Sequence, residues 1–507
     1  MKKSGWSKWV IGAASLLLLS ACGADGGTKA SSSAASSSSE SEVTSGASQQ
    51  EYTDPAELKD QYDIVIVGAG GAGMAAALSA KDAGMNPVIL EKMPIAGGNT
   101  LKSSGGMNAS ETKFQEAQGI EDSNEQFFED TLKGGKGTND QELLHYLVDN
   151  SASAIDWLDS MGITLDNISY SGGASVKRIH RPHDGSAVGR YLVDGLLRNI
   201  HEQEIPLFVN ADVTKINETD GKVTGVNVKI NGEEKEIAGD AVVVTTGGFG
   251  SNKELIEKYR PDLKGYVSTT SEGSTGDGIK MIEELGGATV DMDQIQVHPT
   301  VVQDTGMLIS ETVRGEGAIL VNQQGERFYN ELETRDNVSA AITDLPESYA
   351  YLIFDNALAG RAKQVDYYKE QGVVVEADTI EALAEKIDVD PATLKKTLDT
   401  WNQAVADKAD KDFGRETAMD YDLTEGPFYA IQIAPGIHHK MGGVKINTKT
   451  QVLKEDGTPI TGLYAAGEVT GGIHGQNRIG GNAVADIMVF GRQAGAQSSD
   501  YVKENGK

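Results

Sequence analysis

The fold is decided by DIVIVGAGGAG, residues 63–73 of this 507-residue chain. The first five residues form a compact apolar run, which is typical of a buried parallel strand. The glycines permit a tight turn, a close approach of the backbone to a pyrophosphate and close packing of the next helix. Residues 74–83 are rich in alanine and predict that helix, whose N-terminus would face the phosphates. The stretch therefore predicts a dinucleotide-binding unit.

A second strand is expected at residues 87–90, and it leads directly into Glu91. Glu91 lies eighteen residues past Gly73, where a carboxylate can accept hydrogen bonds from ribose hydroxyls. A glycine-rich turn that binds no ligand is the alternative. The order of strand, turn, helix, strand and acid favours the dinucleotide site.

Two later segments distinguish a flavin from a nicotinamide. Residues 97–100 (GGNT) and 105–108 (GGMN) place small residues where a backbone must approach a flat ring. Far downstream, residues 462–468 (GLYAAGE) predict a strand ending in a turn, and residues 480–483 (GGNA) open a helix that we expect to end at about Ala494. A helix N-terminus there would favour negative charge on the pyrimidine side of a reduced flavin. The C-terminal region is thus expected to complete a site begun near the N-terminus.

These motifs resemble the flavoprotein family that includes the soluble fumarate reductases, the flavocytochrome c type enzymes and the flavoprotein subunits of succinate dehydrogenase and fumarate reductase complexes. The resemblance covers about residues 62–495. It implies an α/β fold in which a doubly wound, Rossmann-like FAD-binding domain carries an inserted α+β capping domain. Some members bind FAD covalently through a histidine near the second motif. Asn99 stands at that place, so the resemblance implies non-covalent FAD.

The cofactor-binding residues implied by the resemblance lie in both flavin segments. They are Gly68, Gly70, Gly71, Ala72, Gly73, Glu91, Lys92, Gly98, Asn99, Thr100, Ser104, Gly105, Gly106, Asp277, His439, Glu468, Asn482 and Ala483. His439 is expected to serve the flavin mainly through its backbone.

A second set of candidate site residues lies between the flavin segments. These residues belong to the segments 298–300, 310–315, 334–336, 438–443 and 477–478. Each group resembles an active-site segment of the soluble fumarate reductases. The resemblance implies that the substrate carboxylates are held by Arg478, His438 and His298, with a further hydroxyl contact from Ser310. It implies that Arg335 donates the proton, and that Glu311 and Arg314 relay protons to it.

The implied reaction is reduction of an activated carbon–carbon double bond, with fumarate as the expected substrate. Guanidinium groups suit planar carboxylates and act most strongly in a dry site. An arginine is an unusual acid, because its pKa is above about 12. The nascent carbanion is a still stronger base, and Glu311 would replace the lost proton.

Each of these residues also has a plainer interpretation. Glu311 and Arg314, three residues apart, are often a surface pair on a helix. His298 before a proline would then be a turn histidine, and Arg335 would form an ordinary salt bridge with Asp336. Their joint occurrence at the family's spacing favours the site. The remaining histidines are interpreted as surface or packing residues (His145, His180, His183, His201) or as near the flavin only by position (His474).

Other functions stay open at this stage. Urocanate or another enoate is the nearest alternative substrate, although related urocanate enzymes carry tyrosine at the place of His298. A steroid or amino-acid-derived substrate would leave Arg478 and Arg335 without a clear role. A non-catalytic flavin electron carrier would need FAD but no acid relay.

Length and charge set limits on organisation and partners. The chain is too long for one simple core, so we expect FAD-binding segments at residues 60–292 and 438–507, with a mobile capping domain at 293–437. The formal charge of −30 argues against nucleic acid or anionic lipid as a partner, so a dianionic substrate would need a local cationic pocket.

The first 59 residues predict a leader and a tether. Residues 1–21 combine a basic start with an apolar run too short to span a bilayer, which indicates a signal peptide. The sequence Leu19-Ser20-Ala21-Cys22 resembles a bacterial lipobox, so Cys22 is expected to be lipidated. A secretory signal with an incidental cysteine is the alternative. Residues 22–59 are rich in serine and small residues, as in a disordered tether.

This organisation predicts an extracytoplasmic, membrane-anchored protein that receives its electrons from outside the chain. Cys22 is the only cysteine, which excludes a disulfide within the chain and leaves no motif for an iron–sulfur cluster or c-type haem. No metal site is expected. A free flavin, a flavinylated lipoprotein or a small cytochrome would supply the electrons.

The anchor can be tested with Cys22→Ala. We expect the wild-type protein to partition into detergent and membrane fractions, and the variant to be released or to stay unprocessed. Phase separation and mass spectrometry of the mature N-terminus measure both outcomes. A correctly processed variant that stays on membranes as wild type does would contradict the lipid anchor.

Overall fold

The computed structural model describes residues 51–506, which belong to one compact unit. The leader, Cys22 and the tether up to residue 50 lie outside the described residues. Within residues 51–506, no helix is long and apolar enough to cross a membrane.

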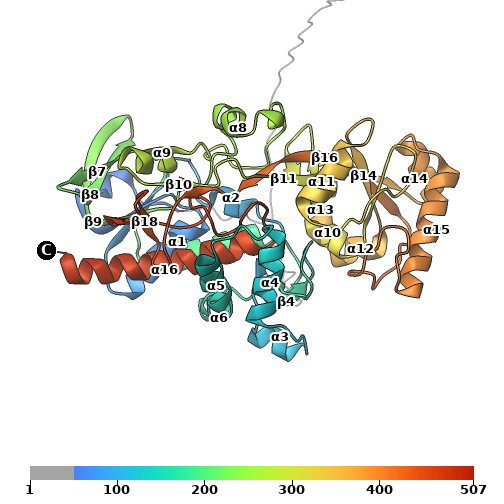
Figure 1. Cartoon of the computed structure of the whole chain (residues 1–507), viewed down its shortest axis with the longest axis horizontal. Helices are drawn as coiled ribbons and strands as arrows, with labels where there is room; N and C mark the ends of the chain where they lie inside the picture. Colours follow the sequence, from blue (N-terminus) through green and yellow to red (C-terminus); the bar gives the residue numbers. More distant parts are fainter. Residues whose placement is uncertain (1–50, 507) are drawn as a thin grey trace, which may run out of the picture. The chain divides into compact units, whose positions relative to one another are not determined.

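The nucleotide-binding unit is built on an eight-stranded sheet with a parallel centre (Figure 1). Strand β1 (Gln61–Val67) lies between β2 (Pro87–Leu90) and β9 (Glu233–Val244), parallel to both. The outer strands are β6 (Leu207–Phe208), β7 (Ala211–Thr219), β8 (Lys222–Ile230), β18 (Gln451–Leu453) and β19 (Pro459–Ala465). This arrangement confirms the predicted α/β, Rossmann-like fold.

Two helices pack tightly beside this sheet because small residues line their contact. Helix α1 (Gly71–Asp82) and helix α16 (Asn482–Asn505) approach so closely that a Cβ on Gly495 would lie 2.2 Å from the Ala76 carbonyl oxygen. A third helix, α7 (Val188–Glu202), also packs on α1.

Two element boundaries differ from the sequence prediction. Helix α1 begins at Gly71, three residues early, because the glycine turn itself forms its first turn. Helix α16 continues to Asn505 and does not end near residue 494. The Ser498 and Ser499 hydroxyls donate back to backbone carbonyls within the helix, so these residues do not interrupt it.

A second sheet forms the capping region, in the order β12-β11-β16-β14-β13, with β15 paired to β16. Its strands are β11 (Ile295–Val302), β12 (Met307–Leu308), β13 (Ile319–Val321), β14 (Ala350–Asp355), β15 (Val375–Ala377) and β16 (Phe428–Lys440). The helices are α10 (Glu311–Gly315), α11 (Arg335–Thr343), α12 (Asn356–Arg361), α13 (Gln364–Glu370), α14 (Ile380–Lys386) and α15 (Pro391–Asp407).

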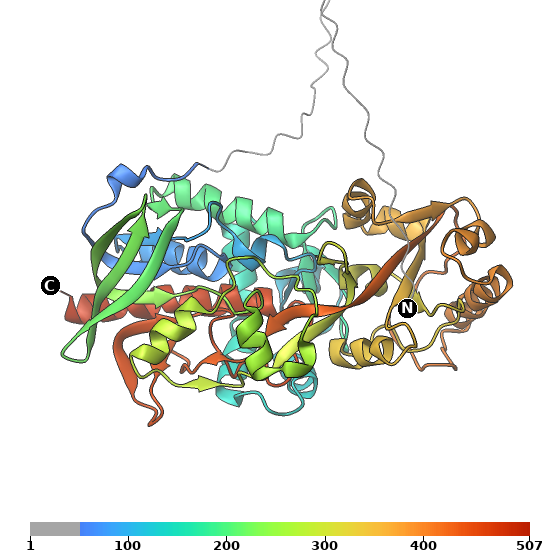
Figure 2. The same ribbon diagram turned by 90° about the horizontal axis from the view of Figure 1, so that it is seen from above.

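The capping region has its own apolar core, which runs from Ile309 to Ile433. The long strand β16 joins the two cores, since Ile433 lies in this one and Ile437 in that of the nucleotide-binding unit (Figure 2). The expected boundaries at 292/293 and 437/438 stay predictions.

Short elements complete the nucleotide-binding unit. They are η1 (Pro55–Glu57), α2 (Gly98–Leu101), β3 (Met107–Asn108), α3 (Lys113–Ala117), α4 (Asn124–Gly134), α5 (Gln141–Asp149), α6 (Ser151–Ser160), β4 (Asn167–Ser169), β5 (Ile179–Arg181), α8 (Lys253–Tyr259), η2 (Pro261–Leu263), α9 (Asp277–Glu284), β10 (Thr289–Val290) and β17 (Gly443–Val444).

The four histidines assigned to surface or packing positions do lie there. His145, His183 and His201 are exposed. His180 is buried, bonds the Thr112 hydroxyl and the Arg178 backbone carbonyl, and burial lowers its pKa to about 4.

Candidate active site

A large cavity of about 910 Å³ joins the two regions. Its volume lies near the upper end of the range of about 300–1,000 Å³ for ligand sites. The cofactor residues inferred from the sequence line this cavity, except for Gly73 and Asn482. Of the reducing-site residues, Arg314 alone is absent from the wall.

Three of the four glycines of the turn have different roles. Gly68 has a φ of 105°, and a Cβ there would lie 2.7 Å from the Thr245 carbonyl oxygen. A Cβ on Gly70 would meet nothing within 4 Å and would occupy cavity space. A Cβ on Gly73 would lie 2.0 Å from the Gly68 carbonyl oxygen, so Gly73 permits close packing of the turn, and it does not line the cavity.

Asn482 also differs from its expected role. It is fully buried beneath the start of α16, where its amide donates to Thr131 Oγ1 and accepts from Asn108 Nδ2. Asn482 therefore fixes the loop before the helix and does not line the cavity.

The polar residues around the turn fit a dinucleotide. Glu91 Oε2 accepts from the Ala69 amide and Oε1 from the Met93 amide, both at 2.8 Å, which holds the carboxylate at the cavity wall. Burial raises the pKa of Glu91. Lys92 donates to Thr275 and pairs with Asp277. Open space at Gly70, the N-terminus of α1 and this carboxylate together match the requirements of FAD.

Asn99 is held by the protein at both ends of its amide. Its Nδ2 donates to Glu468 Oε2 at 2.8 Å, and its Oδ1 accepts from the Ser271 amide at 2.6 Å. His439 also lines the cavity, and its buried Nδ1 has no hydrogen-bond partner within residues 51–506. The expectation that His439 serves the flavin mainly through its backbone stays a prediction.

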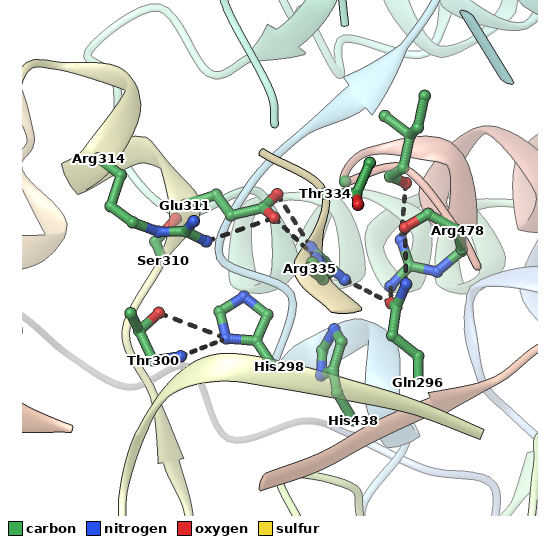
Figure 3. Close-up of polar contacts among 12 residues, drawn as sticks. Gln296, His298, Thr300, Ser310, Glu311, Arg314, Thr334, Arg335, His438 and Arg478 are labelled. Atoms are coloured by element: carbon green, nitrogen blue, oxygen red, sulfur yellow. Dashed lines mark hydrogen bonds and ion pairs between the residues drawn. The ribbon is translucent and has the colours of Figure 1, made fainter. Parts of the chain in front are cut away.

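The reducing site centres on a buried bidentate ion pair between Arg335 and Glu311 (Figure 3). Arg335 Nε donates to Glu311 Oε1 at 2.7 Å, and Nη2 donates to Oε2 at 3.0 Å. Each residue begins a helix, Arg335 in α11 and Glu311 in α10. Burial alone would raise the pKa of Glu311, but Arg335 and the neighbouring arginines lower it to about 2.

Arg314 lies behind this pair, on the side away from the cavity. Its Nη2 is 3.5 Å from Glu311 Oε1, and its Nη1 donates to the Glu331 carbonyl oxygen at 2.6 Å. Burial lowers the pKa of Arg314 to about 10. Because Glu311 and Arg314 are both buried, the interpretation of a surface pair on a helix is wrong.

Gln296 joins the two cavity arginines and was not identified from the sequence. Its Oε1 accepts from Arg335 Nη1 at 2.8 Å and from Arg478 Nη2 at 3.1 Å. Gln296 precedes His298 by two residues in β11, a spacing that places both on one face of a strand. This two-residue spacing is the feature of the sequence from which Gln296 could have been identified.

The two site histidines lie side by side, with ring centroids 5.2 Å apart. Desolvation and the nearby Arg335 lower the pKa of both well below the usual value, so both rings are neutral. The Thr300 amide donates to His298 Nδ1, which places the proton on Nε2, an atom with no hydrogen-bond partner in the described part of the chain. His438 Nδ1 bonds the Thr269 hydroxyl at 2.8 Å. His298 is a strand residue and not a turn histidine.

Ser310 and His474 contribute less than their positions indicated. The Ser310 hydroxyl donates to Thr312 Oγ1 and accepts from the Thr312 amide, so it caps α10. His474 bonds Asp486 and packs against His439 but does not line the cavity.

Charge is concentrated at this end of the cavity. Three guanidinium groups, those of Arg314, Arg335 and Arg478, stand against the carboxylate of Glu311, with His298 and His438 neutral. Two positive charges of this group are therefore not balanced within it. Burial and Arg335 lower the pKa of Arg478 to about 9, which reflects this crowding.

Comparisons with known proteins agree with this site. The profile of a family described as "FAD binding domain" matches residues 63–484. The chain is 53% identical over 440 residues to the NADH:fumarate oxidoreductase of Klebsiella pneumoniae, covering 86% of this chain and 48% of that protein. It is 46% identical to a probable fumarate reductase of Shewanella frigidimarina, covering 86% and 75%.

A solved structure extends the similarity to the fold. The open conformation of a flavocytochrome c3 fumarate reductase superposes with a TM-score of 0.72 at 46% identity, covering 88% of this chain and 79% of that one.

Fold and site together define an FAD-dependent oxidoreductase of the class that acts on carbon–carbon double bonds. The chain belongs to the succinate dehydrogenase/fumarate reductase flavoprotein family. It spans about half the length of the first of these curated relatives and three quarters of the second.

The mode of FAD binding can be tested directly. Asn99 offers no imidazole for a covalent link, so acid precipitation should release all the flavin into the supernatant. Gly70→Val should fold but lose FAD, because its branched side chain would fill open cavity space. Absorbance and circular dichroism measure both properties.

Gly360→Val is the matched control, since Gly360 is an exposed glycine with nothing within 4 Å of its Cβ position. It should retain FAD. Flavin that stays on the precipitated polypeptide, or full FAD content in Gly70→Val, would contradict this account.

Proposed function

We propose that this protein is an extracytoplasmic reductase that converts fumarate to succinate. The observation that carries the proposal is the presence of two guanidinium groups, those of Arg335 and Arg478, in the cavity wall, because fumarate is a dianion with two carboxylates. The net charge of −30 makes such a local cationic site necessary for attraction. The names of the two curated relatives support the same substrate.

The substrate carboxylates are bound by Arg478, His298 and His438 on one wall of the cavity. The guanidinium of Arg478 has a buried Nε with no hydrogen-bond partner among residues 51–506, and His298 Nε2 is likewise unpaired. Unpaired buried donors are costly unless a ligand satisfies them. A carboxylate that accepts from both would remove that cost.

Bound reduced FAD supplies a hydride to one alkene carbon. Arg335 donates a proton to the neighbouring carbon, so the double bond gains one hydride and one proton. After Arg335 has given up its proton, the ionised Glu311 carboxylate accepts a proton from Arg314 and passes it to the Arg335 guanidinium, to which it is bonded at two nitrogens. Closure of the capping region would exclude water and strengthen each of these interactions.

The electrons come from outside this chain, from a free flavin, a flavinylated lipoprotein or a small cytochrome. A lipid anchor at Cys22 and the following tether hold the enzyme at the outer surface of the membrane.

The function is tested by reducing the protein anaerobically and mixing it with fumarate, urocanate, methacrylate or cinnamate. We expect fumarate to reoxidise the FAD fastest, with succinate as the product. Faster reoxidation of the FAD by urocanate than by fumarate would indicate that urocanate, and not fumarate, is the substrate. No reoxidation by any enoate would refute the function.

Arg335→Lys and Arg478→Lys distinguish the role of the proposed acid, Arg335, from that of Arg478, the clamp that binds the substrate carboxylates. Arg335→Lys keeps the charge but not the donor geometry, so kcat should fall by about two to four orders of magnitude with a modest change in KM. Arg478→Lys should raise KM along with any fall in kcat, because the clamp also acts on the bound substrate.

Both variants are measured with excess dye as electron donor and varied fumarate, after reduction of FAD by the dye has been shown to be intact. Near-normal kcat in Arg335→Lys would remove Arg335 from the acid role.

A further inference from the structure

A continuous chain of hydrogen bonds begins at Asp336, the residue after the proposed acid. Asp336 Oδ1 accepts from Asn477 Nδ2 at 2.8 Å, and Asn477 Oδ1 accepts from Gln296 Nε2 at 2.7 Å. Gln296 Oε1 then accepts from Arg335 and Arg478, and Figure 3 shows this last link. This chain of hydrogen bonds thus starts at the residue that follows Arg335 in the sequence and ends at the Arg335 side chain.

Asp336 sets the direction of the Asn477 amide, whereas Gln296 is also oriented by a bond from its Nε2 to the Arg478 carbonyl oxygen at 2.7 Å. An ionised carboxylate only accepts, so the Asn477 amide must turn its NH2 toward Asp336 and its oxygen toward Gln296. Gln296 must then turn its own NH2 toward Asn477, which leaves its oxygen facing the two arginines. A reversed Gln296 would place an NH2 against two guanidinium groups, donor against donor.

Two groups hold the Asp336 carboxylate in place. Lys136 Nζ lies 2.6 Å from Oδ2, and the Thr334 hydroxyl donates to Oδ1 at 2.6 Å. Lys136 has a φ of 59°, a left-handed conformation that costs free energy for a residue other than glycine, and it lies within the loop Gly134-Gly135-Lys136-Gly137. Asp336 therefore pairs with Lys136, and the suggested salt bridge with Arg335 is wrong.

The chain also crosses from one region of the protein to the other. Lys136 and Asn477 belong to the nucleotide-binding segments, whereas Asp336 and Arg335 begin helix α11 of the capping region. The ion pair is partly exposed, with 52% and 29% of the two side chains accessible, and such pairs add little stability. Orientation is the larger consequence of the contact.

We propose that Asp336 is a positioning residue, which ties the start of α11 to Asn477 and thereby holds the acid Arg335 and the clamp Arg478 in register. This inference rests on the proposed function. Asp336 does not touch the reacting atoms and acts through Asn477 and Gln296.

Asp336→Asn tests the claim, because it removes the charge but keeps the shape. An asparagine can donate as well as accept, so the Asn477 amide loses its fixed direction. We expect kcat/KM to fall about 10²-fold, the typical effect of a misplacement of about 1 Å at a reacting centre. Both kinetic constants should change: kcat falls because the acid Arg335 is misplaced, and KM rises because the carboxylate-binding Arg478 is misplaced.

The double variant Asp336→Asn with Asn477→Asp exchanges the two groups and keeps their net charge. The carboxylate introduced by Asn477→Asp would accept from Gln296 and from the amide introduced by Asp336→Asn, and so would restore the link between α11 and the segment that carries Arg478. We expect kcat/KM to recover at least about tenfold over the single variant, since each tenfold step corresponds to restoring one moderate interaction. A purely structural role would predict further loss from the second substitution.

Asp420→Asn is the matched control. Asp420 also pairs with a lysine of the nucleotide-binding segments, Lys177 at 3.9 Å, but its other ion-pair partner among the described residues is Lys408, far from the arginines in the hydrogen-bond chain. It loses the same charge and should keep wild-type kcat and KM. FAD content, dye reduction and melting temperature are recorded for all variants.

Two measurements separate this inference from the proposed function. Failure of the wild type to reduce any enoate would refute the function alone. Crystal structures of the wild type and Asp336→Asn then test the positioning: a Gln296 oxygen that no longer bridges Arg335 and Arg478 supports it, and an unchanged bridge overturns it. Wild-type kinetics in Asp336→Asn, or no recovery in the double variant, would also overturn it.

Discussion

The buried ion pair between Arg335 and Glu311 is the interaction on which the site depends. Its two partners begin different helices of the capping region, and Gln296 joins the pair to Arg478. Because the folded pKa of Glu311 lies near 2, below its usual value, the stability from its ionised form is present above the usual glutamate pKa and is lost as the pH falls toward 2. At neutral pH, removal of one partner of a buried pair costs about 3–5 kcal/mol.

A cluster of buried arginines is unfavourable for folding and favourable for binding. Arg335 and Arg478 repel each other in the free protein, and a bound dianion offsets that repulsion. The substrate therefore supplies negative charge next to the buried arginines. The same arginines stabilise the charge that develops on the substrate carboxylate during reduction. Neutral His298 and His438 add donors without adding to the repulsion.

The sequence predicted the parts of this structure that depend on local patterns. Strand β2 matched its predicted residues because an apolar run ends there at a charged residue, and the turn glycines each have the steric role expected of them. Distant partners were harder to predict. Nothing local to Lys136 or Asp336 indicates that residues two hundred positions apart form a pair, and a polar Gln296 in a strand resembles a solvent-facing residue. A spacing of three residues could not show that Glu311 faces the cavity while Arg314 lies behind it.

The most direct test of the account is a steady-state turnover experiment on Glu311→Gln, because each turnover after the first needs Arg335 to regain its proton. This change keeps the size of the side chain and one acceptor oxygen but removes the carboxylate that accepts a proton and passes it to Arg335. The protein is supplied anaerobically with excess reduced dye and excess fumarate, and oxidation of the dye is followed over many turnovers. The account predicts a rate at least about 10²-fold below that of the wild type in a variant that still binds FAD and is reduced normally. A wild-type rate in that variant would contradict it.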